Sequence, residues 1–224
     1  PRIVYIKARD KSFPSTTLPV WVAPGKFIRI DGQDKLLKTW QIKSDIPQQI
    51  EENGYRDHIA KETAELMKYM AEANELMYVI RYEPDRTPEE VKQAKDKRAS
   101  IIKTSESVGN LIAQKTIDYM KTAPITPIWM DNLLSYSEFL NYGYYLEQKE
   151  KMKELYNRLS EEQKQTQTAK LIDSYLNSMP KVGVGDAMVD GNLYDTAGNL
   201  RHLSEFKGKY ILIDFWGIGC GPCI

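Results

Sequence analysis

The sequence predicts an α+β chain in three successive parts. Short strands separated by turns occupy residues 1–45, and a long stretch with helical periodicity occupies residues 46–180. Residues 181–224 return to short strands punctuated by glycines. We expect the first part to form an antiparallel β-sheet or small sandwich and the second part to be the helical region of the same accessory domain. The third part is then the incomplete start of another domain.

The overall composition limits the classes of function. The 224 residues include 31 basic and 31 acidic ones, so the formal net charge at pH 7 is zero. This balance favours neither a nucleic-acid partner nor a polybasic membrane patch. No apolar run approaches the roughly 20 residues of a membrane span. No signal peptide is visible, because the chain opens inside a predicted strand, and we therefore expect an internal fragment or a processed product.

In the first 45 residues, short runs in which apolar and polar residues alternate are separated by turn signals. Pro24-Gly25 and Asp31-Gly32 are typical turn pairs. The predicted strands are Ile3–Ile6, Val20–Val22, Phe27–Ile30 and one more that Leu36-Leu37 and Trp40–Ile42 suggest. The three large aromatic residues in these strands are expected to lie in the core: Trp21, Phe27 and Trp40.

Two long helices are predicted within residues 46–120. Apolar residues recur at three- and four-residue steps from Ile59 through Met70 to Ile80, which indicates one face of a helix. A second helix begins at Thr87, with Pro88 at its first position and Glu90 completing a capping box. Because the link between the helices is short, we expect an antiparallel hairpin with a methionine-rich packing face.

The rest of the helical region is divided by Pro124 and Pro127. A tyrosine-rich stretch, residues 136–145, is expected to pack in the core, with an exposed docking surface as the alternative. Ser160 and Gln163 form a second capping box, which opens a helix predicted to run to about Met179.

The last part begins with a predicted hairpin and ends in a predicted buried strand. The hairpin turns around residues 195–198, and the strand covers residues 210–216. The hairpin contains His202, which we interpret as a surface or packing residue.

Both cysteines of the chain lie in one C-x-x-C motif, Cys220-Gly221-Pro222-Cys223, which follows the predicted strand. At the start of a helix, such a motif holds the first sulfur over unpaired N–H groups and the positive end of the helix dipole. That setting can lower the pKa of a cysteine from about 8.5 to about 7 or below. We therefore predict Cys220 as the attacking thiol and Cys223 as the resolving thiol in disulfide exchange.

Other uses of a C-x-x-C motif fit this sequence less well. A structural zinc site needs about four ligands, whereas only two histidines, His58 and His202, and no second C-x-x-C are present. Covalent haem attachment requires histidine directly after the motif, where this chain has Ile224. A simple structural disulfide remains an alternative. No cofactor and no metal are therefore expected.

The final 40 or so residues resemble the TlpA/ResA-like thiol-disulfide oxidoreductases of the thioredoxin superfamily, within the broader AhpC/TSA group. Gly185-Asp186-Ala187, the hairpin turn, the strand entered through Lys207-Gly208-Lys209 and the C-G-P-C motif occur in the family's order. Less specifically, the first 180 residues are similar to an accessory domain that precedes such a domain in bacterial envelope proteins.

The resemblance implies roles for four site residues. Cys220 and Cys223 would be the redox couple, Asp214 a buried carboxylate that accepts a proton, and Trp216 the aromatic wall of the site. For Asp214, local pairing within a strand is the alternative. The resemblance further implies a periplasmic or cell-envelope location, protein disulfides as substrates and an upstream thiol reductant as electron donor.

Two departures from the family pattern affect these expectations. Gly219 stands where a tryptophan usually precedes the first cysteine. The chain also ends at Ile224, before the helix that the motif would begin, and this predicts a truncated chain that is not itself a competent oxidoreductase.

Two other functions stay open. One is a peroxiredoxin-like peroxidase, which Gly217 disfavours because such sites usually carry Thr or Ser three residues before the cysteine. The other is a non-catalytic interaction module, in which the helical region forms a homodimer.

Overall fold

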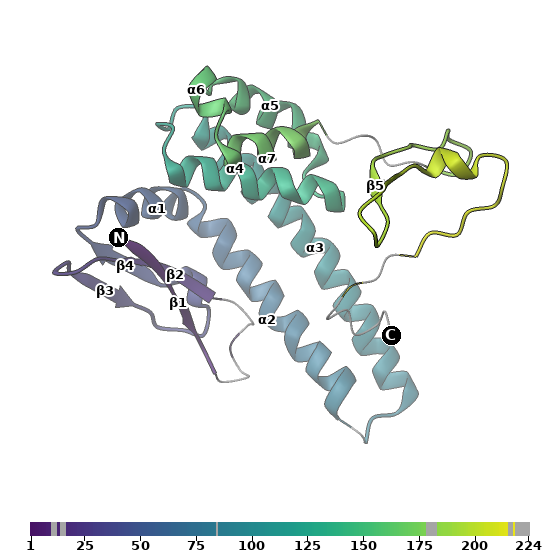
Figure 1. Ribbon diagram of the computed structural model, residues 1–224. Coiled ribbons are helices and arrows are strands. Elements are labelled where there is room, and N and C mark those ends of the chain that lie inside the picture. The colour runs from purple at the N-terminus through teal and green to yellow at the C-terminus, as the bar shows by residue number, and fades with distance from the viewer. Residues whose placement is uncertain (10–12, 14–16, 84, 178–182, 215–216, 218–224) are drawn as a thin grey trace. The chain divides into compact units, whose positions relative to one another are not determined.

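Figure 1 shows the computed structural model of the chain, which describes residues 1–9, 13, 17–83, 85–177, 183–214 and 217. The chain divides into two compact units, Pro1–Ser178 and Met179–Ile224. The described residues combine helices with small antiparallel sheets, in agreement with the predicted α+β class.

The N-terminal strands form two antiparallel hairpins. β1 (Arg2–Lys7) pairs with β2 (Thr17–Val22), and β3 (Ile28–Asp31) pairs with β4 (Gln41–Ser44) after the short helix η1 (Leu37–Thr39). A common core joins the two hairpins, and its buried members are Leu18, Val20, Leu37 and Ile42. These four strands thus form two two-stranded sheets that share one small core. The last predicted strand is wrong at Leu36-Leu37, because Leu37–Thr39 forms η1 and β4 begins only at Gln41.

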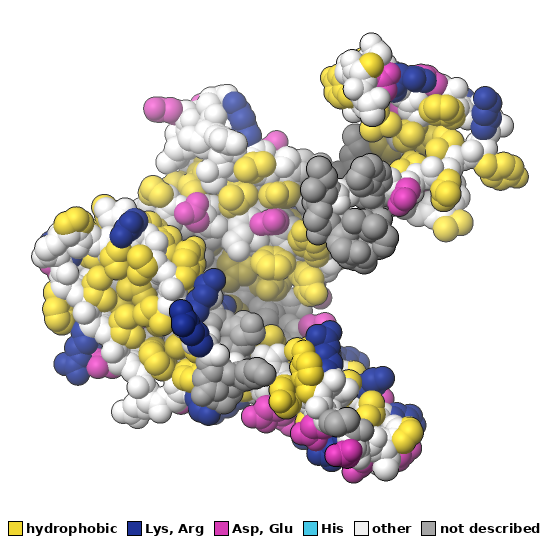
Figure 2. Space-filling view, turned by 60° about the horizontal axis from the view of Figure 1, so that its bottom comes forward, with side chains coloured by type: hydrophobic (Ala, Val, Ile, Leu, Met, Phe, Trp, Pro, Cys, Tyr) yellow, Lys and Arg dark blue, Asp and Glu magenta, His cyan; other side chains and the backbone are white. Residues whose placement is uncertain are grey.

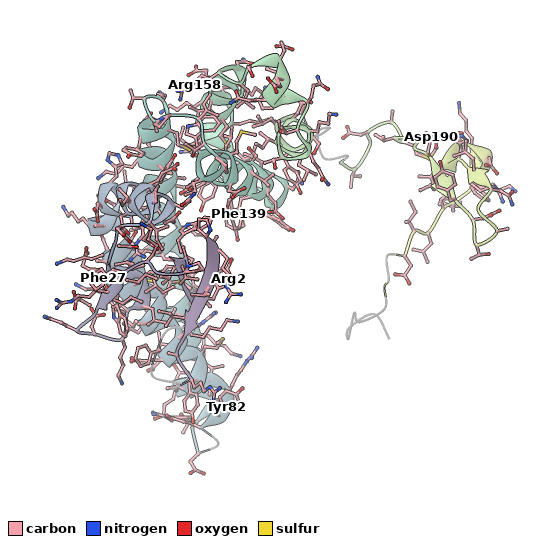
Figure 3. All side chains as sticks on the ribbon, turned by 60° about the vertical axis from the view of Figure 1, so that its left-hand side comes forward. Arg2, Phe27, Tyr82, Phe139, Arg158 and Asp190 are labelled. Carbon is pink, nitrogen blue, oxygen red and sulfur yellow. The ribbon has the colours of Figure 1, made fainter. Side chains whose placement is uncertain are left out.

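One of the predicted core aromatics is exposed. Trp21 and Trp40 are half-buried and pack against the hydrophobic clusters of this unit. Phe27, by contrast, is 62% exposed, and Figure 3 labels it on the surface of the β region. The prediction for Phe27 is wrong because β3 begins one residue later, at Ile28. Successive side chains of a strand point to opposite faces, and in β3 those of Ile28 and Ile30 point toward the core.

Three helices follow: α1 (Pro47–His58), α2 (Ala60–Tyr82) and α3 (Pro88–Met120). The predicted hairpin is confirmed, because α2 and α3 pack side by side (Figure 1). The capping box at the start of α3 is confirmed as well: the Thr87 hydroxyl accepts from the Glu90 N–H at 3.3 Å, and the Glu90 carboxylate accepts from the Thr87 N–H at 2.8 Å. Met70 is 37% exposed, so the predicted apolar face of α2 is only partly correct.

The remaining helices of this unit are α4 (Pro127–Phe139), η2 (Leu140–Tyr142), η3 (Leu146–Gln148), α5 (Lys149–Asn157), α6 (Glu161–Lys164) and α7 (Gln167–Leu176). The capping box of Ser160 and Gln163 is confirmed. The single helix predicted after it is interrupted, because the Thr166 hydroxyl accepts from the Ala169 N–H and starts α7 anew. Tyr136 and Tyr145 pack against the core, whereas Tyr142 and Tyr144 are exposed.

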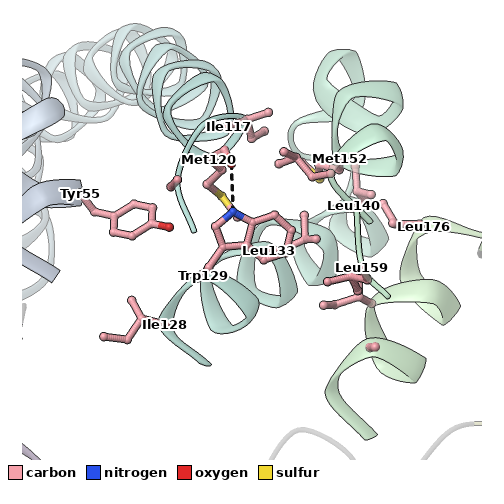
Figure 4. Close-up of a cluster of buried hydrophobic side chains, with 14 residues drawn as sticks. Tyr55, Ile117, Met120, Ile128, Trp129, Leu133, Leu140, Met152, Leu159 and Leu176 are labelled. Atoms are coloured by element: carbon pink, nitrogen blue, oxygen red, sulfur yellow. Dashed lines mark hydrogen bonds between the residues drawn. The ribbon is translucent and has the colours of Figure 1, made fainter. Parts of the chain in front are cut away.

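Trp129 lies at the centre of the largest hydrophobic cluster (Figure 4). Its indole N–H donates to the carbonyl of Met120, the last residue of α3, at 3.0 Å. The Arg158 guanidinium lies 5.5 Å from the centre of the indole and donates to the carbonyls of Met120 and Ala123. These bonds satisfy carbonyls that the end of a helix leaves without intrahelical partners.

Two glycines of this unit should respond oppositely to alanine. Gly109 lies inside α3, where an added Cβ would meet nothing within 4 Å, so Gly109→Ala should stabilise by about 0.5–1 kcal/mol. Gly143 has a φ of +83°, in the left-handed region that disfavours residues with a Cβ. Gly143→Ala should therefore lower the free energy of unfolding by about 1–2 kcal/mol. Urea denaturation of the two variants checks this, and shifts in the same direction would contradict it.

The described part of the second unit contains β5 (Leu193–Tyr194), β6 (Leu200–Arg201) and the short helix η4 (Leu203–Phe206). The predicted hairpin is confirmed, with β5 antiparallel to β6. Its turn is held by the Asp195 carboxylate, which accepts from the N–H groups of Ala197 at 3.0 Å and Asn199 at 2.9 Å.

The buried strand predicted for residues 210–216 does not form over its described part, residues 210–214. These residues carry no strand pairing, and all five are exposed. A strand requires hydrogen bonds from a neighbouring strand, and none of the described strands supplies them here. The rest of this prediction, residues 215–216, lies outside the described residues.

Candidate functional site

The described residues contain one of the four predicted redox residues, Asp214. Trp216, Cys220 and Cys223 lie outside the described residues. Asp214 lies within them, and its side chain is exposed, so the burial expected for this carboxylate is not found. Its role as a proton acceptor stays a prediction, because that role depends on a contact with the cysteines.

The described segment that precedes the motif is organised by Asp190. Its carboxylate accepts from the N–H groups of Leu203 at 2.9 Å and Gly191 at 3.0 Å. A hydrogen bond from the Ser204 side chain, followed by these backbone donors, holds the pKa of Asp190 below its usual value of 3.8. Asp190 thereby joins the segment before the hairpin to the start of η4. An Asp-Gly pair does predict such local bonding, but not to a residue so far along the chain.

His202 lies beside this carboxylate. Its Nδ1 atom is 3.7 Å from the nearer Asp190 oxygen, and both side chains are partly exposed. Next to it, Arg201 and Glu205 form an ion pair at 2.6 Å, and the Glu205 carboxylate also accepts from the His202 N–H at 2.8 Å. These contacts tie β6 to η4, which agrees with the interpretation of His202 as a surface residue.

The first unit contains a buried acid that sequence reasoning missed. The Glu62 side chain is 8% exposed, and one of its oxygens accepts a hydrogen bond from the Lys115 ammonium at 2.7 Å. Its second oxygen has no hydrogen-bond partner among the described residues. The bond from Lys115 holds the pKa of Glu62 below its usual value of 4.5, although burial acts in the opposite direction. The pair links the first turn of α2 to α3 and is structural.

Stability should depend on pH through this pair. Because the pKa of Glu62 is lower in the folded state, its stabilising contribution is present above the unfolded pKa, near 4.5, and is lost as the pH falls through the folded pKa. The difference in unfolding free energy between the wild type and Glu62→Gln should be constant from about pH 6 to 8 and should shrink below about pH 4.5.

Urea denaturation at a series of pH values measures this difference. Glu75→Gln is the matched control, since Glu75 is exposed on the same helix and has no ion pair among the described residues. A difference for Glu62→Gln that does not change between about pH 7 and pH 3 would contradict the assignment.

Two further classes of site find no support in the described part of the chain. No group of three or more His, Cys, Asp or Glu side chains in it is arranged to hold a metal ion. No helix among the same residues is long and apolar enough to cross a membrane.

Comparison with known proteins finds a likeness to one class, the thiol-disulfide oxidoreductases. The similar protein is thiol-disulfide oxidoreductase ResA of Geobacillus kaustophilus (strain HTA426), to which a stretch of 50 residues is 34% identical. The stretch makes up 22% of this chain and spans 29% of the length of that relative. No family model matches the chain. No solved structure matches it either.

Proposed function

We propose that this chain belongs to a thiol-disulfide oxidoreductase that reduces protein disulfides through Cys220 and Cys223. The observation that carries the proposal is the likeness to ResA over 50 residues, in a chain whose two cysteines form a C-G-P-C motif. The likeness supports a general redox function, and the motif supplies the two thiols that such a function requires.

In the proposed reaction the Cys220 thiolate attacks one sulfur of the substrate disulfide. A mixed disulfide forms, and the other substrate sulfur leaves as a thiolate that takes up a proton. The Cys223 thiolate then attacks the Cys220 sulfur and releases the second substrate thiol. Two electrons and two protons pass to the substrate, and the protein is left with a Cys220–Cys223 disulfide. An upstream thiol reductant must return two electrons before the next cycle.

Asp214 and Trp216 have supporting roles in this proposal. Asp214, six residues before Cys220, would accept the proton of Cys223 when that thiol attacks. Trp216 would form an aromatic wall that excludes water from the sulfurs. We further propose that the reaction takes place in the bacterial cell envelope, where disulfide substrates persist.

Trapping of the mixed disulfide tests the assignment of the two cysteines. In the natural protein that carries this sequence, Cys223→Ser should accumulate a mixed disulfide with a model substrate such as insulin, because the resolving thiol is missing. Cys220→Ser should trap none. Either substitution should reduce turnover of insulin disulfides to the rate measured without the protein.

Peptide mapping of the trapped adduct identifies the attacking sulfur. An adduct at Cys223 in the Cys220→Ser variant, with none at Cys220 in the reverse variant, would show that the two roles are exchanged. Peroxide consumption that exceeds disulfide reduction would instead favour the peroxidase alternative.

A further inference from the structure

The far half of the α2–α3 hairpin forms a two-helix arm. The principal contacts of α1, α4 and α5 with the hairpin are made to α3, and those of η1 are made to α2. Figure 1 shows the hairpin extending beyond these elements, and Figure 3 labels Tyr82 at its far end. Two helices alone bury only the seam between them, so the arm retains exposed apolar side chains such as Tyr82.

A groove of about 540 Å³ runs along this arm. Apolar side chains from both helices line it, among them Met77 and Ile80 of α2 and Ile102 of α3. Figure 2 shows hydrophobic side chains among Lys, Arg, Asp and Glu side chains over the projecting end of the arm. The groove therefore combines an apolar floor with a charged border.

The border of the groove is strongly basic. Arg81, Lys95, Arg98 and Lys103 line it, and Glu106 is the acidic side chain among its lining residues. Arg98 crosses between the helices, because its Nε donates to the Ala73 carbonyl at 3.3 Å. Its charge is therefore held beside the apolar floor.

The basic side chains of the groove lack acidic partners within the described chain. Arg81, Lys95, Arg98 and Lys103 have no ion pair with any described residue, whereas neighbouring cations on the same arm do. Arg86 pairs with Glu83 at 2.8 Å, and Lys97 pairs with Glu72 at 2.8 Å. The positive charge of the groove is thus available to a partner.

We propose that this groove binds an amphipathic helix of another protein whose polar face is acidic. Helices bind in grooves by burying an apolar stripe, and complementary charges at the border set orientation and specificity. A second copy of this chain fits less well, since a symmetric contact between two such grooves would bring their basic borders together. The inference goes beyond the redox proposal and does not depend on it.

The probe for the test is a fluorescein-labelled peptide of roughly 18 residues, about five helical turns, with leucines along one face and glutamates on the other. Its binding to the 224-residue chain is followed by fluorescence anisotropy. Lys95→Glu with Lys103→Glu should weaken binding by at least about tenfold. Binding should also weaken as salt is raised.

The matched control is Lys68→Glu with Lys170→Glu. Both lysines are exposed, have no ion pair among the described residues and lie outside the groove, and the change in net charge is identical. Binding to this variant should stay within about twofold of the wild type. Circular dichroism verifies that both double variants keep the helical content of the wild type.

Four outcomes would overturn the proposal. Equal weakening by both double variants would mean that only the overall charge matters, and equal binding of a peptide with the same residues in scrambled order would mean that no helical face is recognised. A dimer in light scattering that Lys95→Glu with Lys103→Glu dissociates would assign the groove to a second copy. Displacement of the peptide by vesicles of anionic lipid, but not of neutral lipid, would assign it to a membrane surface.

Discussion

Replacing Trp129 by alanine is expected to lower the free energy of unfolding of the first unit by about 3–5 kcal/mol. The side chain is 0% exposed at the centre of the largest cluster, so its removal leaves a large cavity among side chains from α3, α4, α5 and α7. It also leaves the Met120 carbonyl without the indole donor and removes the ring beneath Arg158. Urea denaturation followed by circular dichroism measures the loss.

Two further variants separate the causes of this loss. Trp129→Phe keeps most of the ring but removes the donor to Met120, so it should cost less than Trp129→Ala and more than about 1 kcal/mol. Phe27→Ala removes an aromatic ring that is largely exposed and should change stability by no more than about 0.5 kcal/mol. A loss of unfolding free energy below about 1 kcal/mol for Trp129→Ala would show that the Trp129 side chain does not support this core.

The second large effect is expected from the buried amide of Gln49. Its side-chain oxygen accepts from the Trp21 N–H at 2.9 Å, and its nitrogen donates to the Asn53 side-chain oxygen at 2.9 Å. Asn53 in turn donates to the Ile42 carbonyl. Gln49 is 0% exposed, and this chain of bonds connects β2, α1 and β4.

Gln49→Met keeps a similar side-chain shape but leaves the Trp21 N–H and the Asn53 oxygen unpaired. It should therefore lower the free energy of unfolding by about 2–3 kcal/mol. The exposed Gln41 on β4 is the matched control, and Gln41→Met should lie within about 0.5 kcal/mol of the wild type. Combining Gln49→Met with Asn53→Leu in a double-mutant cycle should show coupling, because each residue satisfies the other. Overlapping urea transitions of Gln49→Met and the wild type would contradict this assignment.

Features set by a few neighbouring residues could be predicted from the sequence. The capping boxes at Thr87 and Ser160 and the hairpin turn at Asp195 are correct because their hydrogen bonds join residues close together in the chain. The chemical character proposed for the motif at Cys220 and Cys223 also rests on residue type and spacing, and it stays a prediction. Its surroundings, and the roles of Asp214 and Trp216, stay predictions.

Features that depend on distant segments could not be predicted. The exposure of Phe27 and Met70, the burial of Gln49 and Glu62, and the unpaired state of residues 210–214 each depend on which elements pack against them. The basic groove likewise arises because α2 and α3 bring Arg81 and Lys103 to one surface from separate helices.

The sequence by itself determined the capped starts at Thr87 and Ser160 and the hairpin turn at Asp195, and it carries the prediction of thiol chemistry at Cys220 and Cys223, because hydrogen bonding over a few residues and side-chain reactivity are local properties. Only the tertiary structure decided which side chains leave water and which charges stay unpaired, because these depend on atoms that distant parts of the chain supply.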